Sequence, residues 1–426
     1  MARPFSIILG KTVRRLARLR GGSGSALPGL FVEKIDPSFV KRTLGKLPHG
    51  VVLISGSNGK TTTTKMIVEL LEGQGLRVFT NRTGSNFSRG VAAALLGDIT
   101  ISGKLAADIA VLELDEAHAV HFVRSIKPRH TLLLNVLRDQ LDRFGEIDTT
   151  AKLLATIAEH TTHSVTLNRE DPRITRIAQL VDDKVSVRYF GLAPQLLRQF
   201  PSDDDLHDQS EIIASDLPAD VTLETFSNKD ATFLIDSKPY TTSLKLSGIY
   251  NIFNAAAALA TVRNILSGEV DTPKLMTTLA GITPAFGRGE IIQVHGQPLE
   301  LILVKNPSGF RLGLSSFSPE GYASMIAIND NYADGRDMSW LWDVSFGSLK
   351  DHGVAMVSGI RAYDMALRLD YDTVPFATVV PDLKEALTLF ITTHPDQPKR
   401  IYCTYTAMLA LRRDINLITP VKGIDA

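Results

Sequence analysis

The chain has 426 residues, of which 44% are hydrophobic and 22% charged, and its 46 Lys and Arg balance its 46 Asp and Glu. This length and composition can bury the cores of two or three domains, and the neutral balance gives no electrostatic reason to expect nucleic acid as a partner. The single cysteine, Cys403, excludes a disulfide framework and a multi-cysteine zinc site, and its apolar surroundings predict a buried thiol.

The N-terminal end is basic and amphipathic, with the stretch "KTVRRLARLRGG" at residues 11–22. Two interpretations stay open. The segment is either a helix packed on its own domain with a solvated basic face, or a helix that rests on an anionic membrane surface. The preceding "PFSIILG" is too short for a signal-peptide core or a membrane-spanning helix, so we expect a cytoplasmic protein.

The next segment, "VVLISGSNGKTTTTK" at residues 51–65, is an apolar run that breaks into a glycine-containing turn. A strand that restarts as a helix directs backbone N–H groups and the helix dipole toward one spot, which suits a phosphate. Lys60 would contact the outer phosphates, and Thr61 would bind the accompanying magnesium. The strict phosphate-loop pattern has a glycine where this chain has Ile54, so the loop is a variant. The alternative is an ordinary strand-to-helix turn.

Apolar strands alternate with helical stretches up to about Val165, as "VVLISG", "RVFTN", "IAVLEL" and "HTLLLNV". This alternation predicts a parallel sheet wrapped by helices, and ligands collect at the carboxyl ends of such strands. Polar residues follow two of these strands: Glu113, Asp115 and Glu116 after one, and Asn135, Arg138, Asp139, Gln140 and Asp142 after the other. We expect Glu113 to bind metal or substrate there, and the alternative for each cluster is a helix cap or a surface pair.

The middle segment, residues 195–239, is polar and contains the acidic run "SDDDLHD". We expect strands and loops of a smaller excursion there, without chemistry. A helical stretch, "IFNAAAALATVRNIL", follows it, and the glycines and proline of "GITPAFGRGEI" predict a hinge. Beyond the hinge, "LELILV", "ASMIAIN" and "GVAMVSG" alternate with helices, which predicts a second α/β domain.

Six motifs occur in a characteristic order: "GSNGKTTTT", "ELDE", "NVLRDQLDRFG", "LNREDP", "GIYNIFNAAAA" and "FGRGE". Together they resemble the ATP-dependent Mur ligases and folylpolyglutamate synthases. The resemblance implies an α/β fold, in which a Mur ligase-like P-loop ATPase domain with a parallel sheet precedes a C-terminal Rossmann-like α/β domain. It also implies an enzyme that activates a carboxylate as an acyl phosphate with ATP and magnesium, after which an amine attacks.

The same resemblance implies roles for single residues. The expected ATP-binding residues are Gly56, Asn58, Gly59, Lys60, Thr61, Thr62, Asn251, Asn254 and Arg288. Thr61 and Glu113 are the expected magnesium ligands, with Glu113 on a second ion, and the two later asparagines would approach the adenine side. Asn254 has the alternative of capping or packing its helix, and Arg288 that of a surface position in the hinge.

The C-terminal third narrows the resemblance through "LVKNPSGF", "IAINDNYADGRDMSWLWDVSF" and "SGIRAYDMALRLDY". These stretches, and the entry segment "PGLFVEKIDPSFV", resemble the MurT family, the ligase-like subunits of lipid II isoglutaminyl synthases. The family implies that ammonia from a GatD-type glutaminase amidates the α-carboxylate of D-glutamate in lipid II to D-isoglutamine. That work would take place at the cytoplasmic face of the membrane, where the basic N-terminal segment is a candidate for peripheral contact with the inner membrane surface.

Two other functions compete with this one: a Mur-type ligase that adds an amino acid without a glutaminase, and a nucleotide-binding scaffold that has lost its chemistry. The resemblance divides the chain into a basic helical segment (1–31), an ATP-binding domain (32–284, with the excursion at 195–239) and a C-terminal domain (285–426). Many relatives carry four zinc-ribbon cysteines in the middle domain, and this chain has none there, so zinc is not expected.

The aspartate-rich loop, "DNYADGRDMSWLWD", follows an apolar strand in the terminal domain. One interpretation is a structural loop with Asx turns and a tryptophan anchor. The other is that one aspartate faces the acyl phosphate or orients the histidine of the partner's Cys–His pair. We expect Asp337 in that catalytic role, with Asp334 next.

Two further differences from the sequence pattern of the amino-acid-adding Mur ligases favour the amidating branch of the family. Those ligases often have a histidine metal ligand where this chain has Gln140, and an Asp-Tyr-Ala-His-Asn-Pro signature where it reads Ile302 to Pro307.

Overall fold

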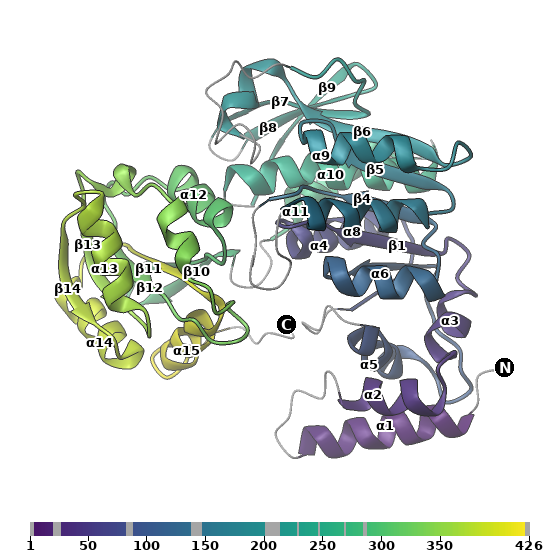
Figure 1. The fold of residues 1–426 in the computed structure, drawn as a ribbon, viewed down its shortest axis with the longest axis horizontal. Coiled ribbons are helices and arrows are strands. Elements are labelled where there is room, and N and C mark those ends of the chain that lie inside the picture. The colour runs from purple at the N-terminus through teal and green to yellow at the C-terminus, as the bar shows by residue number, and fades with distance from the viewer. Residues whose placement is uncertain are drawn as a thin grey trace.

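The computed structural model of the protein describes residues 4–19, 27–81, 88–137, 147–200, 214–227, 230–245, 248–267, 270–283 and 288–421. Within these residues the chain forms two mixed sheets, each covered by helices, in separate parts of the molecule (Figure 1). The first sheet has the strand order β2-β3-β1-β4-β5-β6-β7-β8-β9, and the second has the order β10-β11-β15-β12-β13-β14. The predicted succession of two α/β units is confirmed.

Helices form the N-terminal end of the molecule (Figure 1): α1 (Pro4–Leu19), α2 (Leu27–Ile35), α3 (Phe39–Leu44) and α5 (Ser88–Asp98). α1 and α2 cross closely, because a Cβ atom on Gly10 would lie only 2.6 Å from Val32 Cγ2. α2 lies closer still to α5, because a Cβ atom on Gly29 would lie 1.9 Å from the carbonyl oxygen of Arg89. One face of the basic helical pair therefore packs on its own domain, and the predicted boundary after residue 31 lies inside α2.

The first sheet begins with parallel strands: β1 (Val51–Ser55), β2 (Val78–Thr80), β3 (Ile109–Glu113), β4 (His130–Leu133), β5 (Ser164–Asn168) and β6 (Ser186–Leu192). β1 lies between β3 and β4, with Ile54 beside Glu113. The four strands predicted from the apolar runs are confirmed. Because parallel strands end at the same edge of a sheet, the polar residues that follow them are brought together.

The polar excursion extends this sheet with β7 (Val221–Ser227), β8 (Asp230–Ile235) and β9 (Lys238–Ser243). β7 runs parallel to β6, and β8 and β9 return antiparallel. Strands were expected here, and they continue the sheet. The acidic run lies at residues 202–208, outside the described residues.

Helices cover both faces of the first sheet. One face carries α4 (Lys60–Gly73), α10 (Ile249–Leu266), α11 (Thr272–Gly281) and the short helix η2 (Pro194–Gln199). The other carries α6 (Glu116–Ser125), α8 (Ile147–Glu159), α9 (Pro172–Ile177) and the short helix η1 (Ala178–Leu180). Alternate residues of β1 point to opposite faces, so Val52 and Ile54 pack in one core and Val51 and Leu53 in the other. α10 is buried nearly all round, which explains its run of alanines.

The second sheet comprises β10 (Arg288–Val294), β11 (Gln297–Leu303), β12 (Ala323–Ala327), β13 (Val354–Ser358), β14 (Phe376–Val380) and β15 (Lys399–Cys403). β10 is antiparallel and the others are parallel. Its helices are α12 (Pro307–Ser316), α13 (Ala362–Tyr371), α14 (Leu383–Thr393), α15 (Tyr405–Ile415), η3 (Ser339–Asp343) and η4 (Gly347–Leu349). Residues 284–287 of the predicted hinge (281–291) lie outside the described residues, so the division at residue 285 stays a prediction.

Cys403 ends β15 with its side chain fully buried, as predicted. Burial raises the pKa of its thiol. None of the helices in the described ranges combines the length and apolar character that a membrane crossing requires.

Candidate active site

The loop between β1 and α4 has the backbone of a phosphate loop. Gly56 and Gly59 have φ angles of 135° and 88°, which side-chain-bearing residues rarely adopt. A Cβ atom on Gly59 would also lie 2.8 Å from the amide of Asn254. Ile54 lies before the turn, buried in β1, where no special backbone conformation is needed. The variant loop therefore keeps glycine at the turns that require it.

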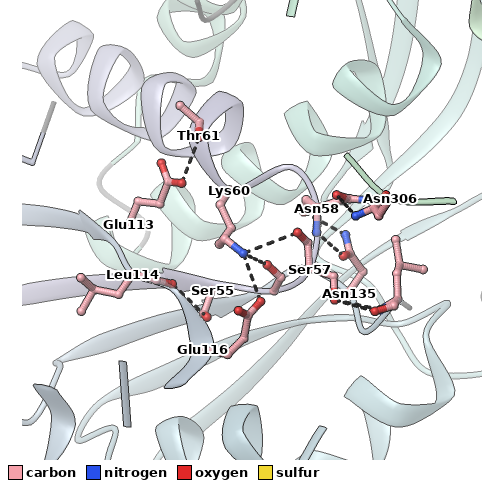
Figure 2. Close-up of polar contacts among 12 residues, drawn as sticks. Ser55, Ser57, Asn58, Lys60, Thr61, Glu113, Leu114, Glu116, Asn135 and Asn306 are labelled. Carbon is pink, nitrogen blue, oxygen red and sulfur yellow. Dashed lines mark hydrogen bonds and ion pairs between the residues drawn. The ribbon is translucent and has the colours of Figure 1, made fainter. Parts of the chain in front are cut away.

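Lys60 opens α4 and is buried at the mouth of this loop (Figure 2). Its Nζ donates to the carbonyl of Gly56 at 2.5 Å and to Glu116 Oε1 at 3.1 Å. The sequence placed Glu116 among the acidic residues after β3 but did not predict this pair. The ammonium is thus held at the turn of the loop beside a buried carboxylate, and its contact with phosphate stays a prediction.

Thr61 and Glu113 meet at the neighbouring strand ends. Thr61 Oγ1 donates to Glu113 Oε1 at 2.9 Å (Figure 2). Asn81, which the sequence analysis missed, fixes the backbone of Glu113: its amide donates to the carbonyl oxygen at 2.8 Å and accepts from the N–H at 3.1 Å. A hydroxyl and a buried carboxylate are hard oxygen ligands, so this pair fits the predicted magnesium site. No group of three or more His, Cys, Asp or Glu side chains in the described parts of the chain could hold a metal ion.

A second segment, after β4, is bonded to the phosphate loop. Asn135 Oδ1 accepts from the N–H of Asn58 at 2.8 Å, and its amide donates to the Asn58 carbonyl at 3.1 Å. Ser57 Oγ donates to the carbonyl of Leu137 at 3.0 Å and accepts from its N–H at 2.9 Å. The loop is thus fixed by pairs of bonds on successive residues. The residues that follow, including Arg138, Asp139, Gln140 and Asp142, lie outside the description.

Asp171, from the motif "LNREDP", anchors this second segment. It is buried, accepts from the N–H of Val136 at 2.7 Å, and caps α9 through the N–H groups of Arg173 and Ile174. Burial raises the pKa of its carboxyl to about 6, against the opposing effect of these bonds. Its role is to hold a backbone in place.

An asparagine pair joins the two parts of the molecule. Asn306 donates its amide to Asn58 Oδ1 at 3.0 Å, and Asn58 donates back at 3.3 Å (Figure 2). Asn306 also caps α12 by accepting from Gly309 N–H at 2.6 Å. The sequence analysis assigned it no role, although an Asn-Pro pair before a helix is a helix-start signal. The C-terminal domain therefore contacts the phosphate loop directly.

Beside this junction lies a pocket of about 550 Å³. Its lining includes the aromatic rings of Phe200, Tyr250 and Phe253, and polar groups such as Asn254 and Arg311. Burial raises the pKa of Tyr250. An aromatic pocket next to a phosphate loop suits a planar base, which agrees with the expectation for Asn254.

The structure gives less direct support for the other expected ATP-binding residues. Asn251 lies one turn earlier than Asn254 on α10 and is not among the pocket's lining residues in the described chain. Thr62 is buried in the first turn of α4. Arg288 begins β10 opposite Ile302, and its side chain lies outside the description.

The aspartate-rich loop lies at the carboxyl end of β12. Asp334 is buried and accepts from the N–H and hydroxyl of Thr406 at 2.7 and 2.5 Å and from Asn331 N–H at 3.1 Å. Burial raises the pKa of Asp334. Asp337 is exposed and accepts only a local bond among those described, from Ser339 N–H at 2.9 Å. Asp334 therefore organises the loop, while Asp337 faces solvent, where its catalytic role stays a prediction.

Comparisons with known proteins agree with the motifs. The sequence profile of the Mur ligase middle domain matches residues 54–262, and that of the MurT ligase C-terminal domain matches residues 303–408. The MurT subunit of lipid II isoglutaminyl synthase (glutamine-hydrolyzing) from Streptococcus pneumoniae is 30% identical, with 93% of each chain covered. The MurT subunit from Staphylococcus aureus strain N315 is 29% identical, covering 88% of this chain and 89% of that one.

Solved structures of Mur-type ligases share the fold. MurF from Acinetobacter baumannii matches with a TM-score of 0.68 at 18% identity, over 91% of this chain and 81% of that one. MurF from Thermotoga maritima, in complex with ADP, gives 0.67 at 17% identity, over 90% and 83%. Folylpolyglutamate synthase from Mycobacterium tuberculosis, complexed with ADP, gives 0.63 at 15% identity, over 91% and 98%. The predicted Mur ligase-like fold is confirmed.

Proposed function

This chain belongs to the MurT family of Mur-type ligases, and we propose that it is the synthetase subunit of a lipid II isoglutaminyl synthase. In this proposal it uses ATP to amidate the α-carboxylate of D-glutamate in the lipid II stem peptide. The single observation that carries the proposal is the arrangement of buried Lys60 and Glu113 with Thr61 on a phosphate loop, in a chain of this family.

In the first step, formation of the acyl phosphate, each of these residues has a separate role. The backbone N–H groups at the start of α4 and the Lys60 ammonium bind the phosphates and the charge that develops as the γ-phosphoryl group moves. Thr61 and Glu113 would hold magnesium, which when bound screens the phosphate charge. Asn254 and the aromatic pocket orient the base. The substrate carboxylate oxygen attacks the γ-phosphorus, ADP leaves, and an acyl phosphate results.

Ammonia completes the second step by attacking the carbonyl carbon, with loss of phosphate and a proton. Cys403 is fully buried with a raised thiol pKa, so it is unsuited to hydrolyse glutamine. The ammonia must therefore come from elsewhere. The relatives are named as subunits of a glutamine-hydrolysing enzyme, which supports a GatD-type glutaminase as the partner of this chain.

An exposed aromatic face in the C-terminal domain is the proposed docking site for that glutaminase. Tyr363, Leu367 and Tyr371 are spaced by four residues along α13, so they share one face, and Trp342 stacks against Tyr371 with ring centroids 5.3 Å apart. Arg361, just before α13, pairs with Asp330 at 3.7 Å, which joins this face to the aspartate-rich loop. A partner bound here would contact the aspartate-rich loop, which also carries Asp337.

An amine-donor assay tests the proposed function. Purified chain, ATP, magnesium and lipid II are combined with ammonium, with glutamine plus the glutaminase, or with single amino acids, and the products are analysed by mass. We expect amidation with the first two donors and none with amino acids. Addition of an amino acid would establish the competing ligase function, and absence of ATP turnover under every condition would establish the scaffold.

Leu367→Ser sharpens the assay for the docking site. It should reduce glutamine-driven amidation at least tenfold and leave ammonium-driven amidation intact, because ammonium bypasses the partner. The matched control is Leu417→Ser, which changes an exposed leucine after α15. Equal loss with both donors would contradict docking at α13.

A further inference from the structure

The N-terminal helical pair exposes a stripe of large apolar side chains. Leu27, Phe31 and Ile35 are 55%, 44% and 40% exposed and lie four residues apart on α2, so they form one face of that helix. Ile8 on α1 is 50% exposed. Large apolar groups gathered in this way on a surface mark an interaction site more often than scattered ones do.

The stripe cannot turn inward, because the opposite face of α2 is tightly packed. Gly29 lies against the carbonyl of Arg89 on α5, and Val32 lies against Gly10 on α1. Pro28, Gly29 and Val32 are buried. Figure 1 shows α1 and α2 together at one end of the molecule. The apolar face of α2 therefore points away from the domain, and the packing against α1 and α5 holds the helix in this orientation.

The surroundings of the stripe are strongly basic. The first 46 residues contain ten Lys and Arg and two Asp and Glu, although the whole chain balances at 46 of each. Arg15, two turns after Ile8 on α1, and Lys34, next to Ile35 on α2, are exposed, as is Lys41 on α3. One of the two acids, Asp36, is already paired with Arg42 at 2.5 Å. The excess positive charge is thus concentrated on the part of the chain that carries the stripe.

We propose that the α1–α2 surface docks on an anionic lipid bilayer, with Leu27, Phe31 and Ile35 entering the headgroup boundary. A basic surface complements anionic lipid, and aliphatic and aromatic side chains within it can enter the acyl region, which a nucleic acid does not offer. This inference rests on the proposed function insofar as a lipid-linked substrate explains why the enzyme would bind a membrane. The face on α13 differs, because it is mainly aromatic and bordered by paired Arg and Asp.

Vesicle cosedimentation of the full chain tests the proposal. Vesicles of phosphatidylglycerol and phosphatidylcholine are compared with pure phosphatidylcholine at low and high salt. We expect at least tenfold stronger binding to the anionic vesicles, weakened by salt. The double variant Leu27→Ser/Phe31→Ser should lose at least tenfold of this binding, and Leu417→Ser should lose none. Circular dichroism confirms that the variants are folded.

Each other outcome would overturn the proposal. These outcomes are equal binding to neutral and anionic vesicles, no binding to either, and binding that survives the double variant. A further one is a concentration-dependent dimer that the double variant dissociates, because the stripe would then be the interface with a second copy.

An activity comparison separates this proposal from the proposed function. The double variant should amidate vesicle-embedded lipid II at least fivefold more slowly than the parent and amidate a short-chain, water-soluble analogue at the parent rate. Equal loss on both substrates would contradict membrane docking. If the parent amidates neither substrate, the proposed function fails, and the vesicle-binding result still decides the docking surface.

Discussion

The carboxyl edges of the two sheets carry similar residues and use them differently. At the first sheet, charged groups meet other reactive side chains: Lys60 pairs with Glu116, and Glu113 accepts from a threonine hydroxyl. At the second sheet, the carboxylate of Asp334 accepts hydrogen bonds from Thr406 and from the N–H of Asn331, and Asp337 is exposed. A dense group of carboxylates in a sequence therefore does not show whether those residues bind ligand or only stabilise a loop. The order and spacing of a motif does.

Each edge also has one buried aspartate that holds a loop in place. Asp171 fixes the segment that carries Asn135, and Asp334 fixes the aspartate-rich loop. Burial raises the pKa of both carboxyls. The comparison thus predicts that substitutions at the first edge will reduce turnover, while buried aspartates at either edge will mainly affect stability.

The largest expected effect is that of Lys60→Ala. Removing the ammonium leaves the loop amides in place but withdraws the charge from the transferred phosphoryl group, so we expect at least ~10³-fold loss of kcat in ammonium-driven amidation. The change also leaves Glu116 buried without its partner, at a cost of about 1–3 kcal/mol in the free energy of unfolding. Lys60→Ala/Glu116→Gln is the control, and it should regain stability without regaining activity. A parent-like kcat in either variant would remove the phosphate loop from the mechanism.

Glu113→Gln should have the next largest effect. The amide keeps the size of the side chain and can accept from Thr61, but it lacks the charge that binds magnesium, so we expect a loss of about 10- to 100-fold in turnover. A magnesium titration should show a higher half-saturation concentration, with nucleotide affinity changed less. Glu69→Gln, a change of the same kind in a partly exposed pair with Lys65, should behave like the parent. Identical magnesium curves for Glu113→Gln and the parent would reject the metal role.

The two aspartates of the second edge should separate activity from stability. Asp337→Asn should change the free energy of unfolding by less than about 0.5 kcal/mol, as exposed substitutions do. It should abolish glutamine-driven amidation and spare the ammonium-driven reaction, because the carboxylate is expected to orient the partner's histidine. Failure with both donors would place Asp337 at the acyl phosphate instead. Full activity with glutamine would eliminate it and transfer the prediction to Asp334.

Asp334→Asn is the matched comparison. The Asn side chain would place an NH₂ group against groups that now donate to the carboxylate. We therefore expect a loss of about 1–3 kcal/mol in the free energy of unfolding, measured by denaturant titration. A stability equal to that of Asp337→Asn would contradict the structural role of Asp334.

The remaining prediction concerns stability alone and is the pH dependence that Asp171 confers. Its pKa is raised from 3.8 to about 6 in the folded protein, so folding favours the protonated carboxyl. The associated stability is fully present below about pH 4 and is lost as the pH rises through 6, by at most ~3 kcal/mol. The free energies of unfolding of the parent and Asp171→Asn are measured by denaturant titration at a series of pH values. Plotted against pH, the two curves should differ in slope over this window and run parallel above it. Parallel curves throughout would show that the pKa of Asp171 is unshifted.

The parts of the site that the sequence predicted are those that lie close in the chain or at adjacent strand ends. The phosphate loop is contiguous, and Glu113 ends a strand beside β1, so its meeting with Thr61 follows from the parallel sheet. The pair of Asn58 and Asn306 spans 248 residues and depends on how the two domains meet, which no local pattern specifies. The bond from Thr406 to Asp334 requires β15 to lie beside β12, and that strand order cannot be read from hydrophobic periodicity.

The claim that this chain activates a carboxylate with ATP is tested most directly by isotope transfer. Lipid II labelled with ¹⁸O in the α-carboxylate of its D-glutamate is incubated with the protein, ATP, magnesium and ammonium, and the released phosphate is analysed by mass spectrometry. The account predicts one ¹⁸O atom in the phosphate for each amide formed, because the carboxylate oxygen becomes the bridge of the acyl phosphate. Amide formation with unlabelled phosphate would contradict it.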